Sequence, residues 1–326
     1  MLCSFFLDMC LNFSVETRIA LPIYECVRQL TILIHNLVSN LSTMAFHHTN
    51  LPTHELVLGL IYTTFFLLLA TNINSVQALS FNFTKFTPHA VSGITFQGDA
   101  QVVNNGAMAL TKRLKLPSGT TRPSTGRVLS APVSLWDTAT GNVASFITSF
   151  SFVIEHTQWG QPTDGVMFFI APQDTVIPSH STSARFGVVD IENAYNQFVG
   201  VEFDLYTNHY DPKSMTYHIG INANSLISLK VVKWEWVSGS LTQVSIAYDS
   251  PSNTLSVVVT YANGKFSTIA QIVDLKAVLP NMVRFGLSGA SITGVAHDIH
   301  SWSLSTSDLK TTTSSASDKL QDIYDN

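Results

Sequence analysis

The strongest constraint on the fold is a repeated pattern that runs from residue 79 to residue 304. Short runs rich in Val, Ile, Phe and Thr alternate there with clusters of Gly, Asn, Asp, Ser and Pro. Such runs predict β-strands bounded by turns. We expect strands at 81–86, 144–155, 165–171, 198–206, 217–222, 226–234, 241–248, 254–261, 282–287 and 297–304.

Two short segments complete this pattern. The sequence YANGK at 261–265 holds an Asn-Gly pair, which is typical of a tight β-hairpin. Only the stretch 275–279 suggests a short helical turn. Many strands without crossover helices predict antiparallel sheets packed face to face, so the expected fold is an all-β antiparallel β-sandwich.

Composition narrows the kind of protein. The three cysteines, Cys3, Cys10 and Cys26, all precede residue 27, so the strand region holds no disulfide framework or thiolate metal site. Stability must therefore come from a large apolar core, which a chain of 326 residues is long enough to bury. Charged residues make up only 12% and the formal charge is −5, so we expect no nucleic-acid partner.

The N-terminal segment has the features of a processing signal. The apolar run at 56–70 suits the hydrophobic region of a secretory signal, although residues 44–55 before it contain no Lys or Arg. The triplet VQA at 76–78 resembles a cleavage site. We therefore expect a signal peptide at 44–78 and a secreted or vacuolar protein. We interpret residues 1–43 as an extension from an over-long gene model, with a signal anchor as the alternative.

The remaining organisation follows from this processing. We expect the functional domain at 79–305 and a polar, mobile tail at 306–326. No run of about 18 apolar residues follows residue 78, so we expect no membrane span in the mature chain. Asn82 begins the triplet Asn-Phe-Thr, which is an acceptor for N-glycosylation.

The segment VGVEFDLYTNHYDPKSMTYHIG at 199–220 carries the most chemistry. Strand alternation directs Glu202 and Asp204 to one face and the apolar residues beside them to the other. Two carboxylates so close repel each other, and this repulsion needs a cation, a proton or a basic partner as compensation. After this pair, no Lys or Arg occurs until Lys213.

The residues of this segment sort by the metal ions they suit. Asp204, Asn208 and Asp211 offer oxygen ligands, which suit Ca²⁺. Glu202 and His218, together with the shared carboxylates, suit an octahedral transition metal such as Mn²⁺. A solvated acidic loop would explain any one of these residues. Their combination, with the His at the head of a new strand, favours a metal site.

This segment resembles the metal-binding signature of the legume lectins, the family of concanavalin A. Other segments match that family in the same order: LSFNFTKF at 79–86, TSFSFVI at 148–154, DGVMFFIAP at 164–172, LPNMVRFGLSGAS at 279–291 and SWSL at 301–304. The resemblance covers about residues 79–305. It implies a legume-lectin jelly roll that binds mono- or oligosaccharides without changing them.

The resemblance implies roles for the residues of the metal signature. The implied ligands are Glu202, Asp204, Tyr206 through its backbone oxygen, Asn208, Asp211 and His218. Asp204 and Asp211 bridge a Ca²⁺ and a transition metal, Mn²⁺ or another ion, and Ser228 holds a metal-bound water. These positions are suitably filled, which argues against the metal-free arcelins and amylase inhibitors.

The resemblance also implies a sugar site made by four loops around the calcium. Asp164 accepts hydrogen bonds from two sugar hydroxyls, and the ring of Tyr206 packs against the C–H face of the sugar. The ion preorganises this site and does not touch the sugar. The implied sugar-site residues are Asp164, Ala184, Tyr206, Asn208, Ile292 and Thr293. The loop that selects the monosaccharide, 289–295, does not distinguish mannose or glucose from galactose or fucose.

Two positions depart from the family pattern. Thr163 stands where Ala usually precedes the key Asp through a cis peptide bond. Ala184 stands where a Gly is expected, and a turn that needs a positive φ would strain it. The alternative function is therefore a storage or defence protein with the lectin fold and weak or no sugar binding.

Enzymes form the other class of alternative. Laminarinase-like glycosidases use Glu-x-Asp-x-x-Glu on one strand, and Glu202 and Asp204 match its first half. Thr207 replaces the second Glu, so the acid/base partner is missing. No Gly-x-Ser-x-Gly supports a nucleophilic triad. We expect a non-catalytic protein, which the family implies to be a homodimer or homotetramer.

Overall fold

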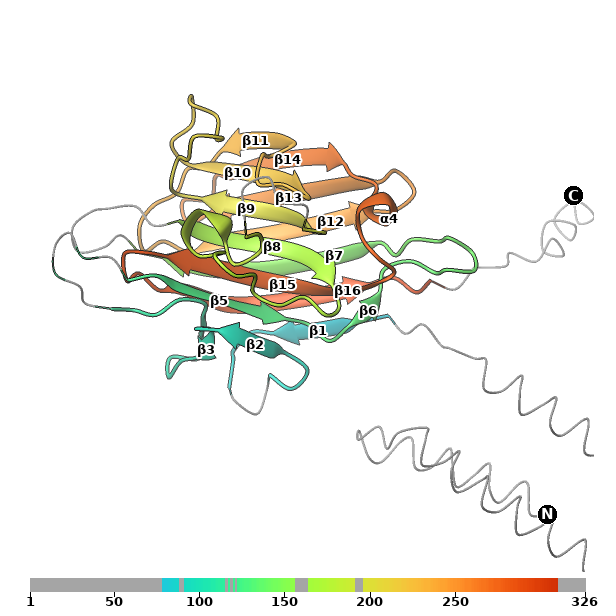
Figure 1. Cartoon of the computed structure of the whole chain (residues 1–326), viewed down its shortest axis with the longest axis horizontal. Helices are drawn as coiled ribbons and strands as arrows, with labels where there is room; N and C mark the ends of the chain where they lie inside the picture. The colour runs from blue at the N-terminus through green and yellow to red at the C-terminus, as the bar shows by residue number, and fades with distance from the viewer. Residues whose placement is uncertain are drawn as a thin grey trace, which may run out of the picture. The chain divides into compact units, whose positions relative to one another are not determined.

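Two antiparallel β-sheets pack face to face in this protein (Figure 1). The computed structural model describes residues 78–87, 91–114, 117, 120, 122–155, 164–190 and 196–309. The chain divides into two units, Met1–Asn74 and Ser75–Asn326, and all described residues belong to the second. The expected extension at 1–43, nearly all of the expected signal peptide and most of the expected tail lie outside the described residues.

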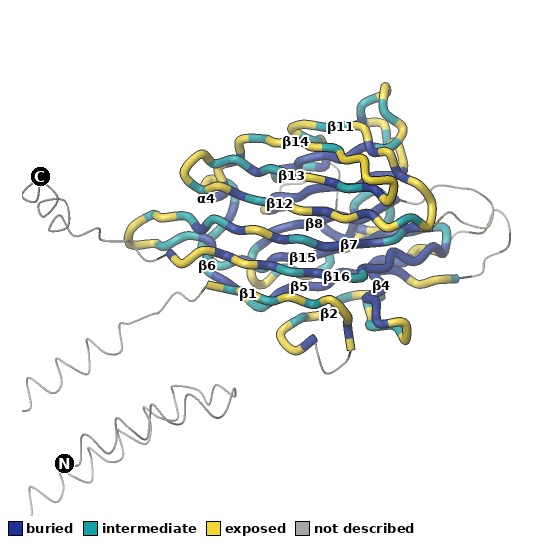
Figure 2. Tube along the Cα trace, turned by 180° about the vertical axis from the view of Figure 1, so that it is seen from behind, coloured by how far each residue is buried: buried dark blue, intermediate teal, exposed yellow. Residues whose placement is uncertain are grey.

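The first sheet consists of β1 (Ser80–Phe83), β3 (Gln101–Val102), β4 (Met108–Ala109), β7 (Phe146–Ile154), β12 (Thr242–Asp249), β13 (Thr254–Tyr261), β14 (Phe266–Ile272) and β16 (His297–Thr306). Its strand order is β14-β13-β12-β7-β16-β4-β3, and β1 also pairs with β16. Side chains alternate along these strands between buried and exposed, as Figure 2 shows for β12 to β14. Only one face of this sheet therefore packs against the core.

The second sheet consists of β2 (Thr95–Gly98), β5 (Ser124–Leu129), β6 (Val133–Ser134), β8 (Gly165–Pro172), β9 (Val199–Asp204), β10 (His218–Ala223), β11 (Lys230–Lys233) and β15 (Met282–Ser291). Its order is β11-β10-β9-β8-β15-β5-β2, and β6 pairs with β15. Every residue of β5 and β9 is buried. The central strands of this sheet are therefore covered on both faces, whereas its edge strands β2 and β11 are partly exposed.

Different apolar clusters cover the two faces of the second sheet. Val201 and Phe203 of β9 point into the main core between the sheets. On the opposite face, a smaller cluster packs Met167 and Phe169 of β8 against residues of the loops, including Phe186. The loops thus rest on an apolar floor, and the polar side chains of β9 lie on the same side as those loops.

Phe203 anchors β9 in the main core. Its ring packs edge-on against Phe150, Phe152 and Trp234, with ring centroids 5.9, 5.2 and 5.8 Å away. Edge-to-face pairs add to the free energy gained from burying the rings. The aromatic packing on one face of β9 therefore fixes the strand that carries Glu202 and Asp204 on its other face.

Helical structure is limited to short pieces in the described part of the chain: a 3-10 turn, η1 (Ser183–Arg185), and one helical turn, α4 (Leu275–Val278). The Asp274 carboxylate caps α4 by accepting from the N–H groups of Lys276 and Ala277. Among the described residues, no helix is long and apolar enough to cross a membrane.

The all-β antiparallel sandwich predicted from the sequence is confirmed, as are the helical turn and the hairpin. In the hairpin, Gly264 has φ +80° and donates to the Tyr261 carbonyl. The expected strand at 226–234 is shorter, because only Lys230–Lys233 pairs with β10. The sequence analysis missed β2 to β6 and β14; most of the former are too short or too uniformly buried to show alternation.

Replacing Phe203 with Ala should destabilise the fold strongly. The ring is fully buried, so its loss leaves a cavity and should lower the free energy of unfolding by about 3–5 kcal/mol. Phe266→Ala is the matched control, because Phe266 is 69% exposed and its loss should cost less than about 0.5 kcal/mol. Urea unfolding of both variants measures the difference, and equal effects would contradict the packing described for β9.

Candidate metal and sugar site

The pairing of β9 with β10 brings the acidic residues to the histidine. Asp204, the last residue of β9, lies opposite His218, the first residue of β10, and Glu202 lies opposite Gly220. A Cβ atom at residue 220 would collide with the Glu202 carboxylate and with the Ser228 hydroxyl. Glycine at this position therefore leaves the space in which the Glu202 side chain lies.

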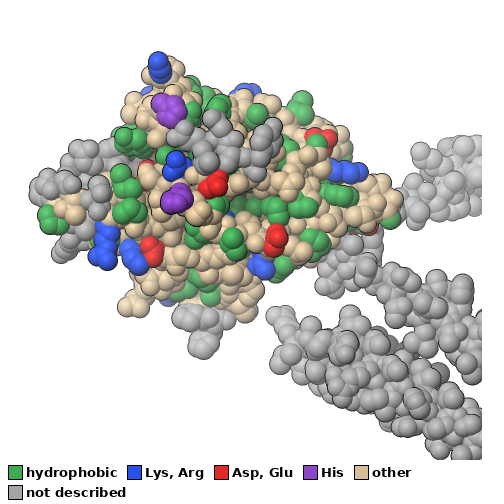
Figure 3. All heavy atoms as spheres, in the orientation of Figure 1, with side chains coloured by type: hydrophobic (Ala, Val, Ile, Leu, Met, Phe, Trp, Pro, Cys, Tyr) green, Lys and Arg blue, Asp and Glu red, His purple; other side chains and the backbone are tan. Residues whose placement is uncertain are grey.

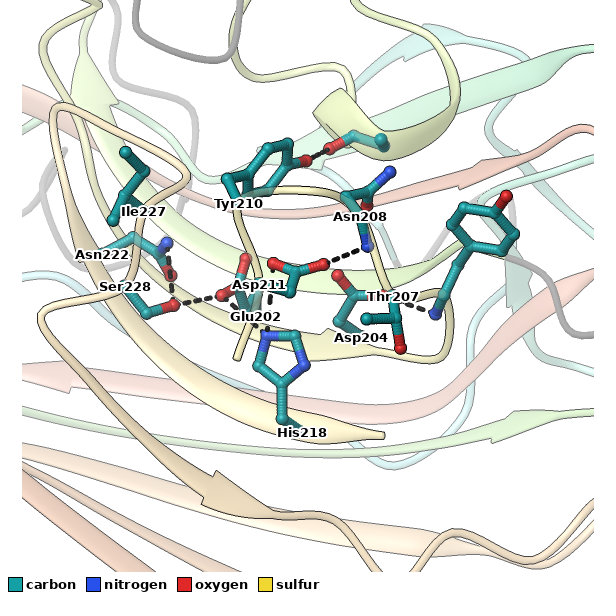
Figure 4. Close-up of polar contacts among 12 residues, drawn as sticks. Glu202, Asp204, Thr207, Asn208, Tyr210, Asp211, His218, Asn222, Ile227 and Ser228 are labelled. Carbon is teal, nitrogen blue, oxygen red and sulfur yellow. Dashed lines mark hydrogen bonds and ion pairs between the residues drawn. The ribbon is translucent and has the colours of Figure 1, made fainter. Parts of the chain in front are cut away.

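Acidic groups and an imidazole converge at this point (Figure 4). One ligand atom from each of Glu202, Asp204 and His218 lies within 4.8 Å of the others. The His218 Nε2 atom is 3.3 Å from Glu202 Oε1 and 3.8 Å from Asp211 Oδ1. This donor set of carboxylate oxygens and one imidazole nitrogen is suitable for a divalent cation.

The three carboxylates are buried and have no Lys or Arg side chain beside them among the described residues. Glu202, Asp204 and Asp211 are 1%, 2% and 7% exposed, and within the described ranges no Lys or Arg forms an ion pair with them. Burial and the charge of Glu202 raise the pKa of Asp204 well above its usual value. Burial also raises the pKa of Asp211. The cluster is therefore costly without a bound cation or protons.

His218 responds to the same charges in the opposite sense. Burial alone would lower the pKa of the imidazole, but the contact with Glu202 and the charge of Asp211 outweigh burial and raise it. A bound metal ion would need the neutral imidazole and would replace the proton in neutralising the carboxylates.

Two polar residues, Ser228 and Asn222, form a hydrogen-bonded chain that ends on the Glu202 carboxylate. The Ser228 hydroxyl donates directly to Glu202 Oε1. Asn222 Nδ2 donates in turn to Ser228 Oγ at 3.3 Å and to the Ser225 carbonyl at 3.2 Å. Asn222 was not predicted as a site residue, although strand alternation places it on the same face of β10 as His218. These linked hydrogen bonds fix the orientation of the Glu202 side chain.

The loop after β9 folds back onto the carboxylates. The backbone N–H of Tyr206 donates to Asp204 Oδ1 at 2.6 Å, and that of Asn208 donates to Asp211 Oδ2 at 2.5 Å. The side-chain oxygen of Asn208 is buried without a hydrogen-bond partner. A buried oxygen acceptor without a hydrogen-bond donor, lying beside carboxylates, is suitable as a cation ligand. Tyr206 is 48% exposed, so its side chain is accessible to a ligand.

Asp164 lies next to this loop at the start of β8. Its carbonyl accepts from the N–H of Leu205 at 2.8 Å. The carboxylate is 2% exposed; Oδ1 accepts from the Ser183 hydroxyl at 2.8 Å, and Oδ2 has no partner. Burial raises the pKa of Asp164 to about 6, while the Ser183 hydroxyl and the nearby backbone of Asp164 and Ile292 act in the opposite direction. The loops that contain Leu205, Ser183 and Ile292 thus meet at Asp164.

The other predicted sugar-site residues lie in the same loops. Ala184 is half-buried, and its carbonyl accepts from the Tyr210 hydroxyl at 3.2 Å. The expected positive φ does not fall on Ala184, but on Ser183 at 60° and on Phe186 at 54°. Thr293 contacts its neighbour Ser291. Thr163 lies outside the described residues.

A buried arginine braces the loop that contains η1. Arg127 of β5 is fully buried and has no carboxylate within ion-pair distance in the described part of the chain. It donates to Gln97 Oε1 at 2.6 Å, to Thr175 Oγ1 at 3.1 Å and to the Gly187 carbonyl at 3.2 Å. The sequence gives no sign of this role, because the strand STGRVL shows no alternation and the partners of Arg127 lie at least 30 residues away along the chain.

Known proteins similar to this chain are plant lectins. A family model described as the legume lectin domain matches residues 78–320. A nodule lectin from Pisum sativum is 58% identical over 272 residues, which cover 83% of this chain and 98% of that protein.

Solved structures agree with this similarity. Peanut lectin with a nonameric peptide has a TM-score of 0.66 and 47% identity, covering 72% of this chain and 100% of that one. The lectin UEA-II complexed with galactose has a TM-score of 0.64 and 41% identity, covering 70% and 98%.

The buried Asp164 should make the stability of the metal-free protein depend on pH. The folded carboxyl has a pKa of about 6 against 3.8 for the usual value, so the folded state binds the extra proton between these values. Its contribution to the free energy of unfolding is therefore present at low pH and lost as the pH rises through about 6. Asp164→Asn removes this contribution.

The stability difference between the native protein and Asp164→Asn should change by about 2–3 kcal/mol between about pH 4 and about pH 7. Urea unfolding in EDTA measures both proteins at both values. A difference that stays constant would show that the carboxyl is not perturbed by its surroundings.

Proposed function

We propose that this chain, which belongs to the legume lectin family and is a carbohydrate-binding lectin, holds its sugar at Asp164 beside two metal ions. The observation that carries this proposal is the buried carboxylate cluster of β9 and the loop after it, which has no Lys or Arg partner among the described residues and adjoins Asp164. The partnerless Asp164 Oδ2 is a buried acceptor, which suits a sugar hydroxyl as donor.

The two ions would share the carboxylates. Asp204, Asp211, Asn208 and the backbone oxygen of Tyr206 would hold a Ca²⁺, because hard oxygen ligands suit it. Glu202 and His218, with the shared Asp residues, would hold Mn²⁺ or another transition metal. When bound, the ions would supply the positive charge that these carboxylates need, and their ligands in the loop would be held in place. The chain's own residues then position Tyr206 and Asn208 beside Asp164.

The ligand class follows from the site and its surroundings. The described side chains on the face that Figure 3 shows form no continuous basic area, which suits an uncharged polar ligand. Relatives include a galactose-binding lectin from Arachis hypogaea. We propose a monosaccharide of this kind, at the end of a glycan, as the ligand. The relatives are lectins, which is consistent with a protein that is not an enzyme.

The expected secretion remains part of the proposal. We propose a signal peptide at 44–78, a lectin domain at 79–305 and a polar tail at 306–326. The signal peptide would direct the chain through the secretory pathway to the vacuole or outside the cell. Asn82 and Thr84 are exposed, so the Asn82 acceptor is open to glycosylation. Homodimers or homotetramers are proposed from the family.

Removing a shared carboxylate should weaken both metal and sugar binding. Asp211→Asn leaves one fewer charge to hold the ions, so binding on a glycan array supplied with Ca²⁺ and Mn²⁺ should fall at least roughly tenfold. Asp174→Asn is the control, since Asp174 is exposed. Sugar binding of the native protein that survives EDTA at acid pH undiminished would refute the role of the metals.

Asp164→Asn should separate the two functions. The amide keeps the shape of the side chain but loses the charge that strengthens hydrogen bonds from sugar hydroxyls. Metal binding, measured by calorimetry, should stay unchanged while sugar affinity falls by roughly tenfold or more. If the native protein binds both metals and no glycan, the storage or defence alternative replaces the proposal.

A further inference from the structure

Arg127 of β5 carries a buried charge that no carboxylate neutralises within the described ranges. The residue is 0% exposed, and burial lowers the pKa of its guanidinium to about 10, so the group still keeps its proton at neutral pH. Removing an ion from water is costly unless other contacts compensate for the lost hydration. The contacts of Arg127 therefore show what this charge is used to hold.

Strand pairing places Arg127 on the face of the second sheet that the loops cover. Arg127 lies opposite Ser288 of β15, which in turn lies opposite Met167 of β8. Met167 lies opposite Glu202 of β9. Residues paired directly across strands project from the same face. The arginine is thus on the same side as Glu202, but three strand spacings, about 14 Å, separate their backbones.

The guanidinium joins three segments of the chain. Nε donates to Gln97 Oε1 on the neighbouring strand β2 at 2.6 Å, and Nη2 donates to Thr175 Oγ1 in the turn after β8 at 3.1 Å. Nη1 donates to the Gly187 carbonyl at 3.2 Å. The Cζ atom also lies over the Phe169 ring, 5.4 Å from its centroid. Because the guanidinium is planar and rigid, it holds these acceptors in fixed positions relative to one another.

Gly187 forms the base of the turn that contains η1. Its N–H donates to the Ser181 carbonyl at 2.7 Å, which closes the turn. The backbone of Gly187 also lies close against β5, because a Cβ atom at this residue would come within 2.7 Å of Thr125 Cγ2. Arg127 therefore holds the base of the 181–187 turn through the carbonyl of the residue that closes it.

The tip of the same turn contacts the proposed sugar site. The Ser183 hydroxyl donates to Asp164 Oδ1 at 2.8 Å, and the Ala184 carbonyl accepts from the Tyr210 hydroxyl at 3.2 Å. Phe186 is buried in the apolar cluster beneath the loops. A shift at the base of the turn would therefore move the groups that surround Asp164.

We propose that Arg127 is a positioning residue of the sugar site, which holds the 181–187 turn in place against Asp164 and so raises sugar affinity without touching the sugar. This inference rests on the proposed sugar site at Asp164. The hydrogen bonds of Arg127 go to other segments than those that carry the proposed metal ligands. Metal affinity should therefore depend on Arg127 little, and sugar affinity strongly.

The variant Arg127→Met tests this, since it keeps an apolar side chain against Phe169 and removes the charge and every donor. The turn loses its contact at Gly187, so sugar affinity should fall by roughly tenfold or more, whereas metal affinity should stay within about twofold. Arg127→Lys keeps the charge, but a single ammonium cannot reach all three acceptors, so it should restore only part of the sugar affinity.

A buried residue of the other sheet provides the matched control. Leu255 of β13 is 1% exposed, so Leu255→Ala should destabilise the fold through a cavity in the main core without touching the turn. At a temperature where every variant is folded, its sugar affinity should equal that of the native protein. This control separates a loss of stability from a loss of position.

The experiment is calorimetry of the full chain expressed through a secretory pathway, with Ca²⁺ and Mn²⁺ titrated first and sugars second. The sugar probes are the methyl glycosides of galactose, glucose, mannose and fucose. Hydrogen–deuterium exchange of the segment 178–190 reports on the turn itself. Exchange there should speed up roughly tenfold in Arg127→Met and stay at the native rate in Leu255→Ala.

The possible contrary results point to different errors. Native sugar affinity in a folded Arg127→Met would refute the role of Arg127. Equal losses of sugar affinity in Leu255→Ala, or a parallel loss of metal affinity in Arg127→Met, would show that the arginine only stabilises the fold. If Arg127→Met does not fold, native affinity and native exchange in Arg127→Lys would refute the inference. No binding of any glycoside by the native protein, with both metals bound, would refute the proposed sugar site itself.

Discussion

The repulsion among buried carboxylates at the end of β9 is the constraint on which the site depends. Glu202, Asp204 and Asp211 lie together at low exposure, and among the described residues no Lys or Arg pairs with them, whereas His218 lies within 3.8 Å of Glu202 and Asp211. Such a cluster is stable only if something else holds it together. The aromatic packing of Phe203 on the other face of β9 supplies a rigid support. The proposed cations supply the compensating charge and connect the support to the sugar loops.

Much of the fold was accessible from the sequence because one sheet is half-buried. The strands at β7, β12 and β13 alternate clearly, since one face meets the core and the other meets solvent. The central strands of the second sheet are covered on both faces. The apolar runs of β8, β9 and β15 were still predicted, whereas β5, with the mixed sequence STGRVL, was missed. The two-residue strands β3, β4 and β6 carry too little pattern to be found, and only pairing defines them.

The residues of the site likewise fall into those that the sequence could predict and those that it could not. Glu202, Asp204 and His218 could be grouped from strand alternation and spacing, because adjacent strands bring these residues together. Ser183 and Arg127 could not, because their contacts depend on how a loop far away in the sequence folds over the sheet. The strain expected at Ala184 illustrates the limit. The turn does contain positive φ angles, but which residues adopt them depends on contacts with Asp164 and Tyr210.

The most direct test of this account is anomalous X-ray diffraction from crystals grown with Ca²⁺ and Mn²⁺. Data at the manganese absorption edge should show one strong peak within ligand distance of Glu202 and His218. A second peak, from calcium, should appear at longer wavelength on the side of Asn208. Crystals that show the three carboxylates and His218 packed together with neither peak would contradict the account, because protons alone would then hold the cluster.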